Sequence, residues 1–194
     1  MTVRKMLGAI FALVLAGAPA QAAVTMSFYA HQLGSKGVWV EFPHAYVVLT
    51  GTPDAGGPAV KANFGFTPPV VGPSILFGRV EGEVDSVDDA YIAKDTPYLT
   101  MPLTDRQYTA VLAVVKRWRD YPQPSYDLDT HDCVIFVRDI AEAVGLKASE
   151  DVRFVRDPAA FMADLRTQNM ALAATPSGRV AGTAKTGTAT AASQ

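Results

Sequence analysis

The chain predicts an α+β fold, with strands in its first half and helices in its second. Segments rich in β-branched and aromatic residues lie between residues 25 and 66, whereas helical spacing of apolar residues begins only after residue 104. Strands followed by helices, rather than alternating with them, are typical of an antiparallel sheet with helices packed against it. With 194 residues and 49% hydrophobic content, the chain is long enough for one such domain with its own core.

A basic start and an apolar run mark the beginning of the chain. Arg4 and Lys5 precede an apolar run from Met6 to Leu15, and small residues end the segment at Ala22. This order is typical of a secretory signal peptide, here cleaved after Ala22. The apolar run is shorter than the ~20 residues that cross a bilayer as a helix. We therefore expect an exported protein, periplasmic or secreted, without a membrane span after cleavage.

The rest of the chain divides into a domain and a tail. Residues 1–22 are the predicted signal peptide, residues 23–173 the domain, and residues 174–194 a stretch of small and polar residues with almost nothing to bury. Such a composition predicts a disordered tail. Removal of Arg4 and Lys5 leaves 15 of the 17 basic residues against 19 acidic ones, a formal charge of −4. No basic stripe remains to neutralise phosphates, so we expect no nucleic-acid partner.

Strands are predicted at residues 25–32, 38–42 and 45–50, where β-branched and aromatic residues are frequent. The turn-rich GTPDAGGP then leads into AVKANFGF, residues 59–66, which alternates as a strand does and makes a hairpin with the strand before it. Two more strands are expected between residues 67 and 100, one of them in SILFGRVEGEVD, residues 74–85.

The segment LTDRQYTAVLAVVKRWRDYP predicts the first long helix. Thr104 and Gln107 have the spacing of a capping box, in which two side chains satisfy free backbone N–H groups of the first turn. Its predicted apolar stripe comprises Tyr108, Val111, Leu112 and Val115.

Two further helices are predicted. One runs from Cys133 to about Val144, with Gly145 as its C-cap. The other runs from Pro158 to Gln168, because proline is favoured in a first helical turn. Its buried face is predicted to comprise Phe161, Met162 and Leu165.

The only cysteine of the chain, Cys133, begins the helix predicted to end near Val144. Cys133 is in register with the apolar stripe Phe136, Val137, Ile140, Ala141 and Val144, so its side chain should face the sheet. Free N–H groups and the helix dipole stabilise a thiolate and lower the thiol pKa below its usual ~8.5. A single exported cysteine has no partner within its chain, which leaves an inert buried thiol, an intermolecular bond or a nucleophile.

A nucleophilic cysteine needs a base, and the chain has three histidines. His131 lies two residues before Cys133, a spacing that does not share a helix face, and fits a loop or cap residue. His31 shares a strand face with Tyr29 and fits a hydrogen-bonded strand residue. His44 opens the apolar strand HAYVVL, where a polar ring needs a partner inside the fold. The alternative for His44 is a core histidine with satisfied hydrogen bonds.

A cysteine at a helix N-terminus and a histidine on a facing strand make up the nucleophile and general base of thiol acyl transfer. The base also needs an orienting group. If the hairpin turns within GTPDAGGP, the residue opposite His44 falls near Asn63, whose side chain can accept from an imidazole N–H. The predicted catalytic residues are therefore Cys133, His44 and Asn63. Neither His-Glu-x-x-His nor paired cysteines occur, so no metal and no cofactor are expected.

This order of elements resembles the circularly permuted branch of the NlpC-type papain-like superfamily, which includes lecithin:retinol acyltransferase-like proteins and bacterial exported relatives. The resemblance spans residues 29–146 and rests on HAYVVL, the hairpin after it and DCVIFVRDIAEAVGL. It implies a circularly permuted papain-like fold, an antiparallel sheet packed against the cysteine helix, with Cys133 as nucleophile, His44 as base and Asn63 as third polar residue. Members often carry Asn where this chain has Asp132, and many use a second histidine in the place assigned to Asn63.

These residues, the export signal and the resemblance lead us to expect a cysteine hydrolase that cleaves an amide bond through an acyl-enzyme, with a peptidoglycan peptide as substrate. One alternative is a hydrolase or acyltransferase for a lipid or lipoprotein ester, and another is a non-catalytic binding module on the same scaffold. The Asp132 carboxylate would oppose thiolate formation unless it faces away as a helix cap. The oligomeric state stays open.

Overall fold

The computed structural model describes residues 24–32, 42–154 and 156–173. The predicted signal peptide and tail lie outside the described residues. So does the strand predicted at residues 38–42, apart from Phe42, which belongs to no strand.

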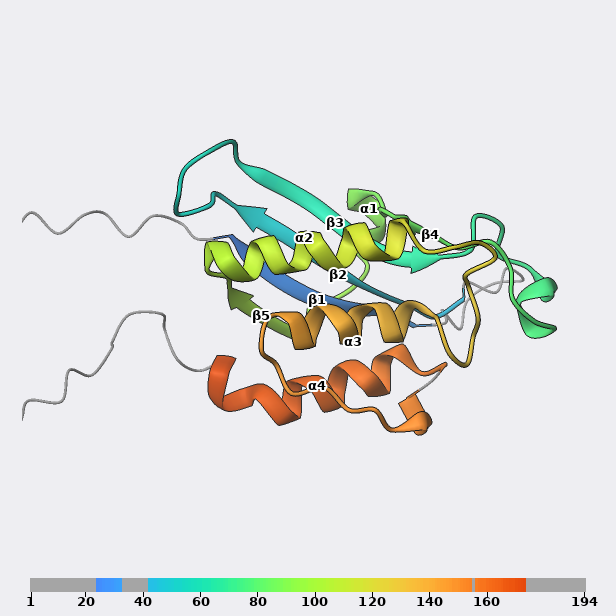
Figure 1. The fold of residues 1–194 in the computed structure, drawn as a ribbon. Coiled ribbons are helices and arrows are strands. Elements are labelled where there is room, and N and C mark those ends of the chain that lie inside the picture. The colour runs from blue at the N-terminus through green and yellow to red at the C-terminus, as the bar shows by residue number, and fades with distance from the viewer. Residues whose placement is uncertain (1–23, 33–41, 155, 174–194) are drawn as a thin grey trace, which may run out of the picture.

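The described residues form an α+β fold built on a five-stranded antiparallel sheet (Figure 1). The strand order is β4-β3-β2-β1-β5, so that β2 lies in the middle of the sheet. The strands are β1 (Thr25–His31), β2 (His44–Gly51), β3 (Val60–Thr67), β4 (Glu83–Asp85) and β5 (Leu99–Pro102). The strands predicted at residues 25–32, 45–50 and 59–66 are confirmed as β1, β2 and β3, and the hairpin as the antiparallel pair of β2 and β3.

The segment predicted as a strand from residue 74 to 85 is mostly something else. Its beginning belongs to η1, a 3₁₀ helix at Pro73–Leu76 with proline in its first turn, and only Glu83–Asp85 pairs as β4. Ile75, whose β-branched side chain favoured a strand, is buried from this single helical turn instead. A left-handed φ of 144° at Gly78 further interrupts the extended chain.

Three long helices cover one face of the sheet, and the short α1 (Asp89–Ile92) lies on the other side (Figure 1). They are α2 (Asp105–Arg119), α3 (Cys133–Ala143) and α4 (Pro158–Ala173), with the short η2 (Val152–Phe154) before α4. α3 packs on β2 and β3, α4 on β1 and β5, and α2 on α3 and β4. The cysteine helix therefore lies between the other two, over the middle of the sheet.

The capping box at the start of α2 is confirmed, but the buried stripe of this helix differs from the predicted one. Val111 and Val115 are buried as expected, whereas Leu112 is 39% exposed. Val114 and Trp118 are buried in addition, and Trp118 Nε1 donates to Asp139 of α3 at 2.9 Å. Because the large indole buries more apolar area than a leucine, burial of the row that contains Trp118 is favoured over burial of the predicted row.

The cysteine helix follows its predicted pattern. Its apolar stripe is buried throughout, and Gly145 has a left-handed φ of 85°, as a C-cap requires. The last helix begins at Pro158 as predicted, and it continues beyond Gln168 to Ala173. Its predicted apolar residues are buried, namely Phe161, Met162 and Leu165.

Alternation along β2 separates two environments. Ala45, Val47 and Leu49 are fully buried against the helices. His44 and Tyr46 point to the other face, because successive strand residues alternate. The sheet thus has an inner, apolar face under α2, α3 and α4 and an outer face that carries polar and aromatic side chains.

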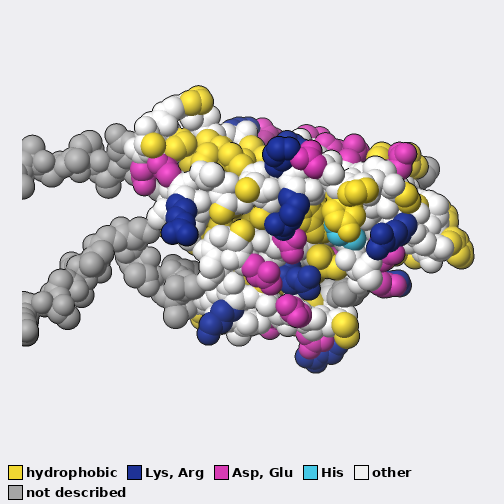
Figure 2. All heavy atoms as spheres, viewed as in Figure 1, with side chains coloured by type: hydrophobic (Ala, Val, Ile, Leu, Met, Phe, Trp, Pro, Cys, Tyr) yellow, Lys and Arg dark blue, Asp and Glu magenta, His cyan; other side chains and the backbone are white. Residues whose placement is uncertain are grey.

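The surface over the three helices carries basic and acidic side chains in mixture, and hydrophobic side chains gather at the end of the molecule next to η1 (Figure 2). The exposed apolar residues of that region are Val70, Val71, Leu76 and Phe77. Within the described ranges, no helix is both long and apolar enough to cross a bilayer.

Candidate active site

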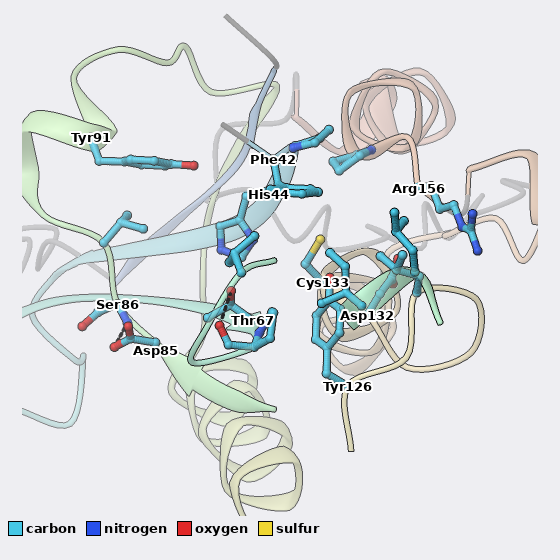
Figure 3. Close-up of a pocket in the computed structure, with 18 residues that line it drawn as sticks. Phe42, His44, Thr67, Asp85, Ser86, Tyr91, Tyr126, Asp132, Cys133 and Arg156 are labelled. Carbon is cyan, nitrogen blue, oxygen red and sulfur yellow. Dashed lines mark hydrogen bonds between the residues drawn. The ribbon is translucent and has the colours of Figure 1, made fainter. Parts of the chain in front are cut away.

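A cavity of about 530 Å³ lies where β2 and α3 both begin. Cys133, the first residue of α3, and His44, the first residue of β2, both line it. In Figure 3, the Cys133 sulfur faces the cavity from the helix side and the His44 ring lies on the strand side. The structure therefore brings the two predicted catalytic residues to one cavity, although they belong to opposite faces of the sheet.

Burial dominates the electrostatics of Cys133. The residue is only 4% exposed, and burial, aided by the Asp132 carboxylate, raises the pKa of its thiol to about 12. The backbone N–H groups of Ala45, Cys133 and Val134 act in the opposite direction, because they stabilise the thiolate. The helix N-terminus does act to lower this pKa, but burial outweighs the N–H groups, so the expectation of a thiol pKa below its usual value is wrong for the protein without substrate.

Asp132 is the N-cap of α3. Its side chain accepts the Ile135 N–H at 2.9 Å, as an aspartate in this position commonly does. Burial raises the pKa of this carboxyl to about 6, although backbone N–H groups, including that of Ile135, act to lower it. Asp132 therefore caps the helix, as the sequence allowed. Its carboxylate charge nevertheless opposes ionisation of Cys133.

The His44 ring is half-buried on the outer face of the sheet, beside the cavity. Burial and, to a smaller extent, His31 lower the pKa of this imidazole to about 4, and the Asp85 carboxylate acts to raise it. At neutral pH the thiol of Cys133 and the imidazole of His44 are therefore both uncharged. No hydrogen bond joins these two residues in the part of the chain that the structure describes.

Asn63 lies on β3 in a different place from the one predicted. The register pairs Asn63 with Val48 and Gly65 with Tyr46, so His44 lies nearer the Thr67 end of β3. The Asn63 amide also has other partners, because Oδ1 accepts the Val87 N–H at 2.7 Å and Nδ2 donates to the Val87 carbonyl at 2.9 Å. Asn63 is not among the described residues that line the cavity.

The other two histidines have the structural partners that a non-catalytic role predicts. His31 is 6% exposed, and its Nδ1 lies 3.0 Å from Asp95 Oδ1, an acid that also accepts the Tyr46 hydroxyl at 3.0 Å. The His131 ring stacks on Trp118 with 3.8 Å between the ring centroids, and its Nδ1 lies 2.8 Å from the carbonyl oxygen of Ser125.

Sequence reasoning missed most of the cavity wall. Its apolar part includes Phe42, Pro68, Val71, Ile75, Leu76 and Val87, and most of these residues come from the segment between β3 and β4. The signal for this wall was the uncharged run TPPVVGPSILFG, residues 67–78, which offers apolar side chains in a segment without strand or long-helix periodicity. The polar part of the wall includes Asp85, Ser86 and Arg156.

The acidic loop before α3 is organised by its own backbone. Asp127 Oδ1 accepts the N–H groups of Asp129 and Thr130 at 3.0 and 2.9 Å, as in an Asx turn. Across the described ranges, no three or more His, Cys, Asp or Glu side chains are grouped so as to hold a metal ion.

No family model matches the chain, and neither a curated protein nor a solved structure matches it. What this cavity does is therefore argued from its own residues.

Proposed function

We propose that this protein is an exported thiol hydrolase or acyltransferase with a circularly permuted papain-like fold, in which Cys133 is the nucleophile and His44 the base. The observation that carries the proposal is that a helix N-terminal cysteine and a strand histidine line one cavity. The α+β architecture, with the cysteine helix packed on the strand that carries the histidine, supports the same proposal.

The uncharged state of both side chains decides how the thiol is activated. His44 takes the thiol proton as sulfur attacks, so that an S–C bond forms and the carbonyl π electrons move to oxygen. When this oxyanion collapses, the bond to the leaving group breaks, and His44 returns the proton to that group. Water then attacks the thioester by the same route, and its proton passes through His44 to the departing thiolate. Cys133 thereby acts as a serine would, deprotonated only during reaction.

The oxyanion needs N–H donors directed at the reacting carbonyl. The N–H groups of Ala45 and Cys133 already act on the sulfur. We assign them to the oxyanion site, Ala45 being the donor that the sequence did not identify.

The wall of the cavity favours an apolar acyl group over a polar stem peptide. Most of its lining is apolar, and the exposed side chains of Val71 and Leu76 continue this character to the surface. Burial of acyl methylenes there yields about 0.8 kcal/mol each. A lipid or lipoprotein acyl bond is therefore our first candidate substrate, and the peptidoglycan amide is the second.

Acyl-enzyme formation tests this function directly. The purified protein without its predicted signal peptide is mixed with p-nitrophenyl butyrate, p-nitrophenyl dodecanoate or a peptidoglycan stem peptide, then quenched in acid for intact mass spectrometry. We expect an adduct of the acyl mass on Cys133, formed faster from dodecanoate than from butyrate. Cys133→Ser and His44→Ala should each reduce turnover at least about 100-fold, the usual contribution of such groups. Turnover that survives Cys133→Ser would contradict the proposal.

The third candidate, a binding module without turnover, is favoured by the raised pKa of the thiol and by the missing hydrogen bond between Cys133 and His44. Its signature would be a rise in melting temperature with dodecanoate, equal in the native protein and in Cys133→Ser, with no acyl adduct.

A further inference from the structure

The His44 ring occupies the place that a side chain at position 65 would fill. An ideal Cβ on Gly65 would lie 2.3 Å from His44 Nε2 and 2.8 Å from Cε1, which is inside van der Waals contact. At position 65, β3 therefore contributes no side chain beneath the ring. We expected β3 to supply the orienting group for the base, Asn63. Instead, β3 has a glycine where the His44 ring lies.

The next strand, β4, supplies a carboxylate opposite Gly65. Gly65 pairs with Asp85 of β4, and residues paired in an antiparallel sheet carry their side chains on the same face. Because Gly65 has no side chain, no side chain at position 65 separates the His44 ring from Asp85. Asp85 lines the same cavity as His44, on the side of the strands in Figure 3. Its Oδ1 accepts the Ser86 N–H at 2.7 Å.

Charged and titratable groups face this part of the sheet from several elements. They are His31 of β1, Tyr46 of β2, Asp85 of β4, Tyr91 of α1, Asp95 and, across the cavity, Tyr126, Asp132, Cys133 and Arg156. Asp95 is engaged with His31 and Tyr46, and Asp132 caps α3. Of the two charges that act on the pKa of His44, that of His31 lowers it and that of Asp85 raises it.

We propose that Asp85 is the positioning residue of His44, its carboxylate acting over the side-chain-free Gly65 to stabilise the imidazolium that forms when His44 takes the Cys133 proton. The proposal rests on the proposed function for its catalytic meaning. It moves the third polar role from Asn63 on β3 to an acid on β4.

The charge of Asp85 can be removed against a matched control. Glu83 lies two residues away on the same strand and faces the same side, pairing with Thr67. Asp85→Asn and Glu83→Gln remove the same charge from the same strand. NMR titration of the His44 ring should give a pKa lower by about 1 unit in Asp85→Asn, because an attractive charge is lost. In Glu83→Gln the His44 pKa should equal that of the native protein. Equal shifts in the two variants, or none, would overturn the proposal.

Turnover of p-nitrophenyl dodecanoate at pH 7 provides the second measurement. Asp85→Asn should lower kcat at least about 10-fold with KM unchanged, because imidazolium forms only during reaction. Asp85→Glu, which restores the charge, should recover most of that loss. A KM effect alone would assign Asp85 to the cavity wall instead and would overturn the proposal. If Cys133→Ser keeps the turnover of the native protein, the proposed function fails. The NMR titration of His44 still decides in that case whether the Asp85 charge acts on the ring.

A third variant tests whether the His44 ring needs a residue without a side chain at position 65. Gly65→Ala places a methyl group against the movable end of the His44 ring, and the nearest backbone atom, the Ala45 oxygen, lies at 3.4 Å. We expect the ring to be displaced, kcat to fall at least about 10-fold and the strand to stay folded by circular dichroism. Native kcat in this variant would overturn the role given to Gly65.

Discussion

The two faces of the sheet bury polar groups in different ways. On the inner face, His131 is held between the Trp118 ring and the carbonyl of Ser125, so its position is determined by packing. On the outer face, His44 lies over a residue without a side chain, and its neighbours act on it mainly by burial and charge. A histidine held by ring stacking and a hydrogen bond stabilises a fold, whereas one beside a cavity can exchange a proton.

Cys133 and His44 come from these two different environments. The thiol extends the apolar stripe of α3 on the inner face, and the imidazole extends the polar row of the outer face. They share a cavity because both α3 and β2 begin at the same end of the sheet. We therefore expect the inner face to determine the stability of the fold and the outer face to determine the pH dependence of the proposed reaction.

The largest effect is expected on the inner face. Trp118→Ala removes a ring that stacks on His131, contacts Phe66 and bonds Asp139, so unfolding free energy should fall by about 3–5 kcal/mol. Leu112→Ala on the same helix is the control and should cost under about 1 kcal/mol, because Leu112 is 39% exposed. Urea denaturation at pH 7 compares the two. Equal losses would contradict the assignment of the buried stripe.

The next effect concerns Asp132, the N-cap of α3, and the dependence of stability on pH. Asp132 is buried with a pKa raised to about 6, so the native state disfavours its charge. A raised pKa of an acid gives stability that is complete below the unfolded value of about 3.9 and lost as pH rises through 6. Asp132→Asn keeps a cap without the charge and should be more stable than the native protein by up to about 3 kcal/mol at pH 8.

Urea denaturation of Asp132→Asn and the native protein at pH 4 and pH 8 measures this difference. The two should be nearly equal at pH 4, where the aspartate is protonated. The substitution should also lower the pKa of Cys133, visible as faster alkylation by iodoacetamide at pH 9. A difference in stability that is the same at both pH values would show that the carboxylate charge is not responsible.

The smallest effect separates structure from catalysis on the outer face. Asn63→Ala removes the two hydrogen bonds to Val87 and should cost about 1–2 kcal/mol of unfolding free energy. The Asn63 amide is bonded to the Val87 backbone and not to His44. The pKa of His44, measured by NMR titration, should therefore not change in Asn63→Ala. A pKa change as large as that in Asp85→Asn would return the third catalytic role to Asn63.

Local patterns in the sequence were enough to predict the helices and the place of Cys133 at the start of α3. Thr104 and Gln107 form the predicted capping box, and Gly145 ends α3 as predicted, because these motifs involve neighbours in the chain. Leu112 was placed wrongly because a row shifted by one helical position is almost as apolar, and only the fit of Trp118 against α3 selects between them.

Local patterns could not predict which residue of β3 lies beside His44. A shift of two or four residues between β2 and β3 leaves every side chain on its own face, so alternation cannot distinguish Asn63 from Gly65 or Thr67. The long connection between these strands, which spans residues 52–59, does not fix the register either.

The sequence by itself determined the α+β order, the inward face of Cys133 and the candidate pair with His44, because each depends on periodicity or composition within one element. Tertiary structure alone decided the charge states of that pair, since burial depends on what packs around each group. It also decided that the His44 ring lies over Gly65 of β3, and that Gly65 pairs with Asp85 of β4.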